Sequence, residues 1–291
     1  MCAPSVIEKV RQRISRRDLL KSTTAAAAGV LAAGCQTTAK AKAAPATEPI
    51  SFTRVVDLSH TLHPDFPAWF VPGVEKTFGT KTFLPPAIVD VERVFKFEEI
   101  GINLNKITYW EHVGTHMDAP NHFSGGSSVE KIKAEDLVLP LAVIDIRAKA
   151  ASDPLALLTL EDVKAWEAKY GRIPERACLA MNSGWATHIN TPKFKSLNSN
   201  GELQQPAFHI DAIEFIMEER NVASIAVDTF SFDNLHAPEH DVHYAWLGDE
   251  RWGIEVVNNL NDVPAVGATI VVGQPKIQGG SGGPNRVMAL V

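Results

Sequence analysis

The sequence predicts a mixed α/β domain. Apolar runs rich in β-branched residues, typical of buried strands, alternate along the chain with two segments of amphipathic helical pattern. The composition, with 45% hydrophobic residues, 21% charged residues and three cysteines, is that of an ordinary globular protein. We therefore expect a core of strands with helices packed beside it.

Five apolar runs predict the strands. Each is four to six residues long and has the Val, Ile and Leu content of a strand covered on both faces. The predicted strands are Val55–Leu58, Leu141–Ile146, Ala177–Met181, Ser224–Asp228 and Ala268–Val272.

Two helices are predicted between these strands. The first begins at Thr159, where Thr-Leu-Glu-Asp162 resembles a capping box, and it ends at Tyr170 before Gly171. The second runs from Ile210 to about Arg220 and places apolar side chains on one face.

The first 44 residues resemble a twin-arginine export signal followed by a short linker. Arg16 and Arg17 precede a short apolar run that is too short to cross a membrane. Cys35 could become a lipid anchor, whereas cleavage after a small residue near Ala43 would release the protein, and we favour release. We expect residues 45–291 to form a single domain that is exported to the periplasm or the cell exterior.

Charge excludes one class of partner. The chain has a formal net charge of −6, and its first 44 residues are rich in Lys and Arg, so the rest is more acidic still. Phosphate binding needs a basic surface, so we expect no nucleic-acid partner.

One short segment holds three histidines and a carboxylate, in His112-Val-Gly-Thr-His116-Met-Asp118-Ala-Pro-Asn-His122. Imidazole and carboxylate form a ligand set that suits zinc, manganese or iron. We expect His112, His116 and Asp118 to bind a divalent metal. We expect His122 to be the catalytic acid or base, because imidazole exchanges protons near pH 7. Any one of these histidines could instead be an ordinary hydrogen-bonded residue, and His122 could be a fourth ligand.

The same segment is predicted to be a loop. Gly114 and Pro120 disfavour a helix, and the segment follows a strand-like run at Lys106–Trp110. Loops on a rigid scaffold often carry the chemistry of an enzyme.

The pattern H-x-G-T-H-x-D-x-P-x-H resembles the signature of the cyclase family of metal-dependent hydrolases, which includes bacterial kynurenine formamidases and isatin hydrolases. Val56–His60, Pro67–Trp69, Asn182–Trp185 and Val227–Ser231 are also similar to segments of that family. The resemblance covers roughly residues 52 to 291. It implies a swivelling β/β/α fold, with a mostly β, barrel-like core and flanking helices, and hydrolysis of a small amide, lactam or ester. It also implies a homo-oligomer.

The resemblance implies a second metal position, completed by His243 and Glu255. Many relatives have this glutamate in a Glu-Asn-Leu tripeptide, whereas this chain has Asn258-Asn-Leu260 there, and the spacing from His243 favours Glu255. Glu255 could instead be an ordinary surface residue. The site could hold one metal ion or two, and the metal could be zinc or manganese.

Aromatic residues early in the chain are candidates for substrate binding. Trp69 and Phe70, with His60, would suit a planar aromatic amide, whereas the same aromatic residues are as easily core or oligomer contacts. The further aromatic residues in this cluster are Phe66, Phe78 and Phe83. The histidines expected to be structural or exposed are His63, His188, His209, His236 and His240.

The predicted activity is hydrolysis by metal-activated water, since a bound divalent metal lowers the pKa of water from 15.7 to roughly 7. The sequence also offers two alternatives. Gly279-Gly-Ser281-Gly-Gly283 matches the G-x-S-x-G motif of serine hydrolases. The α/β-hydrolase fold requires a histidine after the nucleophilic serine, and no histidine follows this motif. An exported protein that binds a metal or small ligand without turnover is the second alternative.

Overall fold

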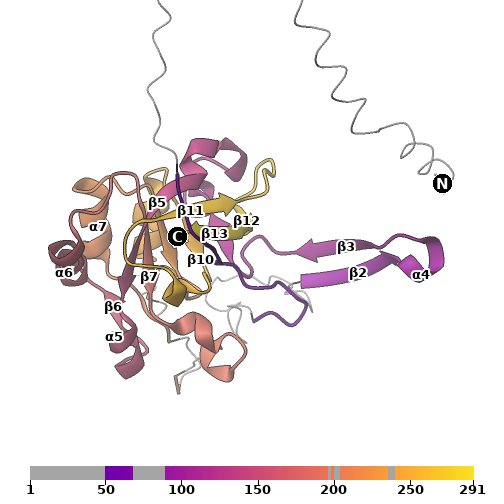
Figure 1. Ribbon diagram of the computed structural model, residues 1–291, viewed down its shortest axis with the longest axis horizontal. Helices are drawn as coiled ribbons and strands as arrows, with labels where there is room; N and C mark the ends of the chain where they lie inside the picture. Colours follow the sequence, from indigo (N-terminus) through magenta and orange to yellow (C-terminus); the bar gives the residue numbers. More distant parts are fainter. Residues whose placement is uncertain (1–49, 68–88, 196–197, 200–203, 235–239) are drawn as a thin grey trace, which may run out of the picture. The chain divides into compact units, whose positions relative to one another are not determined.

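All five predicted strands belong to one nine-stranded sheet in the computed structural model (Figure 1), which describes residues 50–67, 89–195, 198–199, 204–234 and 240–291. The strand order is β1-β13-β11-β5-β7-β9-β10-β4-β12. These strands are β1 (Val55–Asp57), β4 (His116–Asp118), β5 (Val138–Asp145), β7 (Cys178–Asn182), β9 (Ser224–Val227), β10 (Trp252–Glu255), β11 (Ala268–Gly273), β12 (Gly282–Pro284) and β13 (Arg286–Leu290).

The middle of the sheet is parallel and its two ends are antiparallel. Strands β5, β7, β9 and β10 run parallel, whereas β11, β13 and β1 on one side and β4 and β12 on the other pair antiparallel. Parallel strands are normally covered on both faces, which explains the uninterrupted apolar runs in the sequence.

Side chains from alternate positions fill two separate cores. Leu141 and Val143 of β5 face one core, while Ala142 and Ile144 face the other. The first core is enclosed by the sheet itself, because strands from both ends of the strand order contribute to it, including Val287 of β13. The sheet is therefore curled into a half-barrel, and the mixed α/β fold with a barrel-like core is confirmed.

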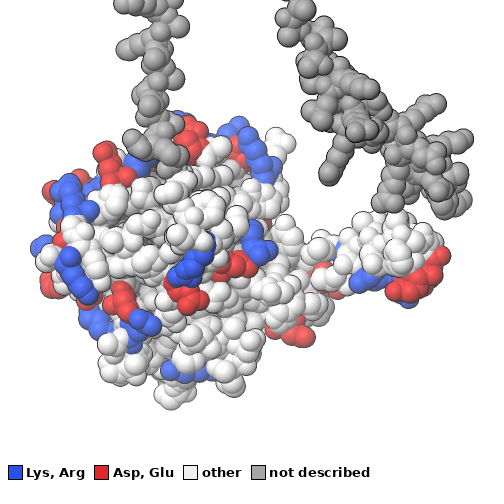
Figure 2. All heavy atoms as spheres, in the orientation of Figure 1, with Lys and Arg blue, Asp and Glu red and all other residues white. Residues whose placement is uncertain are grey.

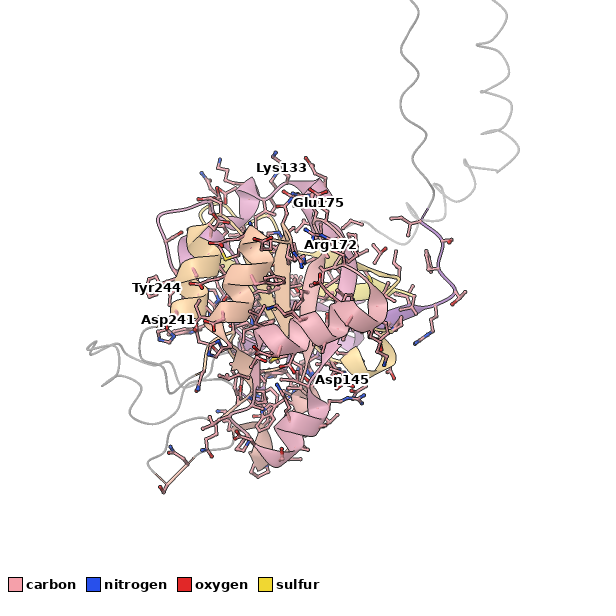
Figure 3. The ribbon with its side chains drawn as sticks, turned by 90° about the vertical axis from the view of Figure 1, so that its left-hand side faces the viewer. Lys133, Asp145, Arg172, Glu175, Asp241 and Tyr244 are labelled. Atoms are coloured by element: carbon pink, nitrogen blue, oxygen red, sulfur yellow. The ribbon has the colours of Figure 1, made fainter. Side chains whose placement is uncertain are left out.

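Three helices pack against the second core. They are α6 (Leu160–Tyr170), α7 (Ile210–Glu218) and α8 (Asp241–Gly248). The first begins as predicted, since the backbone N–H of Thr159 donates to the Asp162 carboxylate at 2.8 Å, and Gly171 follows its last turn at φ 92°. Helix α7 ends two residues before the expected Arg220. Figure 3 shows this helical side, with Asp241 and Tyr244 of α8 at its outer edge.

The remaining elements are short or lie outside the large sheet. Strands β2 (Val89–Phe95) and β3 (Leu104–Tyr109) form a hairpin that carries α4 (Phe97–Ile100) at its tip. Strands β6 (Leu157–Leu158) and β8 (Ala207–Phe208) form a two-stranded pair, and α5 (Arg147–Ser152) follows β5. No helix in the described ranges has the length and apolar character needed to span a bilayer. The predicted export signal and Cys35 lie outside the described residues.

A close approach between β10 and a buried ring gives a test of this packing. A Cβ on Gly253 would lie 2.4 Å from Cζ of Phe232, whose ring is fully buried. We expect Gly253→Ala to lower the free energy of unfolding by about 1–3 kcal/mol through overpacking.

The matched control is Gly248→Ala at the end of α8, where an added Cβ has nothing within 4 Å. This variant should be neutral or slightly stabilising, because alanine restricts the unfolded chain. Urea unfolding of both variants checks the prediction, and equal midpoints would contradict it.

Candidate metal centre

Strand β4 carries two of the predicted ligands. His116 and Asp118 are two residues apart, so their side chains point to the same side of the sheet, and both are buried. Met117, between them, faces the core enclosed by the sheet. The prediction that these ligands lie on a loop is therefore wrong for His116 and Asp118, although it holds for His112. Pairing with β10 and β12 makes this three-residue segment a strand, and the local sequence does not reveal that pairing.

The register between β4 and β10 brings Glu255 to the site. Glu255 lies directly opposite His116, and Glu255 Oε2 is 3.4 Å from His116 Nε2. The residue opposite Asp118 is Gly253, where the Phe232 ring occupies the space that a Cβ would need. The backbone N–H of Phe232 donates to Glu255 Oε1 at 3.1 Å and so fixes the carboxylate.

Helix α8 contributes His243. His243 Nε2 lies 3.3 Å from Asp118 Oδ2 and 3.3 Å from Glu255 Oε1. Its other ring nitrogen, Nδ1, lies 2.5 Å from Asp233 Oδ2, and the backbone N–H groups of Val242 and His243 also donate to Asp233. Asp233 thus orients the imidazole, as a carboxylate commonly does for a metal-binding histidine.

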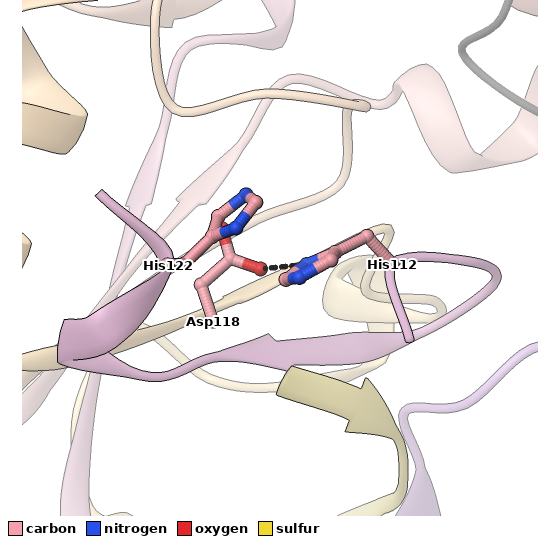
Figure 4. Close-up of side chains that lie close together, drawn as sticks. All are labelled: His112, Asp118 and His122. Carbon is pink, nitrogen blue, oxygen red and sulfur yellow. Dashed lines mark hydrogen bonds and ion pairs between the residues drawn. The ribbon is translucent and has the colours of Figure 1, made fainter. Parts of the chain in front are cut away.

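His112 and His122 also lie close to Asp118 (Figure 4). His112 Nδ1 is 2.7 Å from Asp118 Oδ1, and the His122 ring stacks on His112 with centroids 3.7 Å apart. His122 ends the short 3-10 turn Pro120–His122 that follows β4. The four histidines and two carboxylates of the sequence prediction therefore meet around Asp118.

The electrostatics of this cluster favour a cation. Burial alone would lower the pKa of His116, but the carboxylates of Asp118 and Glu255, each 3.4 Å from Nε2, outweigh it and raise that pKa to about 10. The pKa of His243 is likewise raised well above its usual value by these two carboxylates and Asp233, against the effect of burial. Burial would raise the pKa of Asp118, yet the surrounding imidazoles hold it well below the usual range.

The same cluster has the donor set of a divalent metal site. His116 Nε2 and Asp118 Oδ2 are buried without a hydrogen-bond partner in the described part of the chain. Possible ligand atoms of His116, Asp118 and Glu255 lie within 4.8 Å of one another, as do those of His112, Asp118 and His122. With Asp118 shared, this arrangement can hold one ion or two.

Comparison with known proteins decides the family. The family model described as "Putative cyclase" matches residues 56–234. The chain belongs to the cyclase family. The chain is 28% identical over 249 residues to the isatin hydrolase of Roseibium aggregatum, covering 81% of the chain and 91% of that protein. It is 26% identical over 208 residues to the kynurenine formamidase of Bacillus cereus, covering 70% of the chain and 81% of that protein.

Solved structures agree with this assignment. Isatin hydrolase A from Labrenzia aggregata, bound to benzyl benzoate, superposes with a TM-score of 0.75 at 33% identity, covering 82% of this chain and 93% of that structure. An isatin hydrolase bound to the product analogue thioisatinate gives a TM-score of 0.74 at 27% identity, covering 81% of this chain and 92% of that structure.

Of the predicted substrate-binding residues, the structure describes His60. Its backbone N–H donates to Thr115 Oγ1 at 2.9 Å, and burial lowers the pKa of its imidazole to about 4. Thr115 in turn donates to the carbonyl of Val256, so His60 is joined to the end of β10. Trp69 and Phe70 lie outside the described residues, as do Phe78, Phe83 and His236. Phe66 is buried beside His60.

Two residues beside the predicted ligands were not predicted from the sequence. Asp233, described above, is one. His240, expected to be structural, precedes α8 with its ring 6.1 Å from His243, and its Nδ1 is buried without a partner among the described residues. The sequence signal for His240 was its position three residues before His243. The signal for Asp233 was a carboxylate ten residues before the same histidine. Of the others, His209 accepts from the backbone N–H of Asp211 at the start of α7, and the His188 ring contacts Trp185.

The backbone just after Glu255 is strained. Val256 adopts a left-handed conformation at φ 56°, which is unfavourable for a β-branched residue. Hydrogen bonds on both sides hold it, because its N–H donates to the Thr229 carbonyl and its own carbonyl accepts from Thr115. Such strain persists only where the surroundings impose it, and it is commonest at functional sites.

Proposed function

We propose that this protein is an exported metal-dependent hydrolase of a small aryl amide or lactam. The observation that carries the proposal is the buried Asp118, whose carboxylate lies between His112 and His116 on one side and His243 on the other. Glu255 lies near both His116 and His243. These imidazoles and carboxylates have the ligand chemistry of zinc or manganese.

The protein's own residues supply positioning and proton transfer. A divalent ion held there would polarise a carbonyl oxygen and lower the pKa of water. Burial, followed by the charges of neighbouring imidazoles, lowers the pKa of His122 to about 4, so this ring is neutral at pH 7. A neutral imidazole can accept a proton from the attacking water and return it to the leaving nitrogen.

The names of the relatives indicate the substrate class. An isatin hydrolase opens a lactam fused to an aromatic ring, and a kynurenine formamidase acts on a formamide. Both reactions break a carbonyl carbon–nitrogen bond next to an aromatic system. We therefore propose that an aryl formamide or an aryl lactam is the substrate, and that an ester is a weaker one.

The alternative is an exported protein that binds a metal or small ligand without turnover. His122 argues against it, because the ligand groups around Asp118 include His116, His243 and Glu255 without any need for a further imidazole. A neutral, buried imidazole beside the ligands is what a hydrolase needs for proton transfer.

Metal content and turnover of the purified protein test the proposal together. We expect zinc or manganese by elemental analysis, and hydrolysis of an aryl formamide or isatin that a chelator abolishes. His122→Ala should keep its metal and lose roughly 10²–10⁴-fold in kcat, the usual contribution of a general acid or base.

The matched control is His188→Ala, which removes an imidazole on the Trp185 turn and should keep full activity. Metal without turnover on any substrate would favour the binding protein. A metal-free active protein would overturn the proposal.

We also propose export through the twin-arginine route, supported by the Arg16-Arg17 pair and the apolar run after it. Replacing both arginines by lysine should leave the protein in the cytoplasm, as fractionation of cells would show. Export of that variant at the original level would contradict this proposal.

We further propose that the protein is a homo-oligomer and that the hairpin of residues 89–109, here called the arm, carries the contact. None of the residues between Val89 and Tyr109 is buried. Figure 1 shows the hairpin extending away from the large sheet. Its exposed large apolar residues make up half of those in the described chain. They are Val91, Val94, Phe95, Phe97, Ile100, Ile102, Leu104 and Ile107.

These apolar residues cover both faces of the arm. Val91 lies opposite Ile107 on one face, and the bulge after Arg93 puts the pair Phe95 and Leu104 on the other. Eight half-exposed side chains present on the order of 600 Å² of apolar surface, close to the ~800 Å² per partner of a standard protein interface. An isolated two-stranded hairpin is also marginal in water unless something covers it.

A second copy of the chain fits the arm better than a membrane does. The arm carries acidic residues, Asp90 and Glu92 among them, alongside a similar number of basic ones, and much of its visible surface in Figure 2 is uncharged. Attraction to anionic lipid needs a clear excess of Lys and Arg.

Val91→Asp should convert the oligomer to a single chain, because it places a charge in the apolar contact. Val266→Asp is the matched control, since Val91 is 41% exposed and Val266, outside the arm, is 39% exposed. Size-exclusion chromatography with light scattering gives the mass of each. A wild-type protein that is monomeric at micromolar concentration would contradict the proposal.

A further inference from the structure

The glycine-rich segment that matches a serine-hydrolase motif lies against the metal centre. Ser281 Oγ donates to Glu111 Oε2 at 2.6 Å, and the backbone N–H of Ser281 donates to Glu111 Oε1 at 3.2 Å. The same hydroxyl oxygen lies 3.0 Å from His112 Nε2. A hydroxyl has one proton, which here goes to Glu111, so Ser281 accepts from His112 Nε2–H.

This chain of hydrogen bonds determines the tautomer of His112. With Nε2 protonated, the neutral ring has its lone pair on Nδ1, which lies 2.7 Å from Asp118 Oδ1. A lone pair and a carboxylate oxygen at that distance repel each other unless a cation is shared between them. The ring nitrogen turned toward Asp118 is thereby the one available to a metal ion.

The close approach of the His112 ring explains the glycine at position 282, next to Ser281. A Cβ on Gly282 would lie 2.6 Å from Cε1 of His112 and 2.3 Å from the carbonyl oxygen of Met117. Gly282 pairs with Asp118 across β12 and β4, and the Ser281 carbonyl accepts from the Ala119 N–H at 2.9 Å. Backbone pairing thus holds the serine hydroxyl at a fixed place relative to Asp118.

This geometry also argues against a nucleophilic role for Ser281. The nucleophile motif requires a histidine later in the chain that takes the proton of the serine, whereas the Ser281 hydroxyl donates to Glu111 and no histidine follows it. The segment shares the spacing of a nucleophile motif but has a different structural environment.

We propose that Glu111 and Ser281 are positioning residues that fix the His112 ring with Nε2 protonated and Nδ1 turned toward the metal ion. This inference rests on the proposed metal site. Partners of this kind fix the orientation of a ligand imidazole and raise its basicity, and their loss typically weakens metal binding by roughly 10–100-fold.

Zinc affinity, measured by competition with a chromophoric chelator, is the test. We expect Ser281→Ala and Glu111→Ala each to weaken zinc binding by about 10–100-fold. Glu111 acts on His112 only through the Ser281 hydroxyl. The double variant should therefore bind zinc about as tightly as Ser281→Ala alone, whereas the fold-losses of zinc affinity would multiply if the two residues acted independently.

The matched control is Ser183→Ala. Ser183 Oγ donates to the buried Asp228 carboxylate at 2.5 Å. This is a serine–carboxylate hydrogen bond like that of Ser281 with Glu111, but it does not involve His112. This variant should lower thermal stability and leave zinc affinity unchanged. Nitrogen-15 spectra of the zinc-loaded wild type should show His112 with Nε2 protonated.

The outcomes separate the two claims. Wild-type protein without zinc affinity would overturn the proposed function and this inference with it. Tight zinc binding that Ser281→Ala leaves unchanged, or a His112 ring protonated on Nδ1, would overturn this inference alone and leave the proposed hydrolase intact.

Discussion

The structure of this site depends on one buried carboxylate. Asp118 is inaccessible to solvent, and its oxygens lie 2.7 Å, 3.4 Å and 3.3 Å from nitrogens of His112, His116 and His243. A carboxylate removed from water is costly unless positive charge or hydrogen bonds compensate it. The imidazoles around Asp118, and the cation that they can share with it, provide this compensation.

The sheet places the groups that Asp118 needs. Its parallel centre is covered on both faces and forms a rigid scaffold, while the antiparallel pairing of β4 with β10 and β12 brings distant segments to one edge. Opposite Asp118, both neighbouring strands have glycine, Gly253 and Gly282. A larger residue at either position would meet Phe232 or His112.

Local sequence patterns predicted the parts of the site that are local. The segment from His112 to His122 has its ligands at short spacing, and the long apolar strands and the helix capped at Thr159 have clear signals. Strand β4 was predicted as a loop because three residues show no periodicity and their pairing partners are more than a hundred residues away. Asp233 orients His243 through geometry that depends on the fold of α8, so its position ten residues before His243 does not by itself identify it.

The site also bears on how this edge of the sheet holds together. Strands β4 and β12 have three residues each and end the strand order, with β12 as the edge strand, and short segments at such an edge open locally at a lower free energy than the core. An ion bound by Asp118, His243 and Glu255 would join β4, α8 and β10. By thermodynamic linkage, each tenfold rise in its free concentration above the dissociation constant adds about 1.4 kcal/mol to the free energy of opening. Such an ion would then stabilise this edge of the sheet in addition to any part in catalysis.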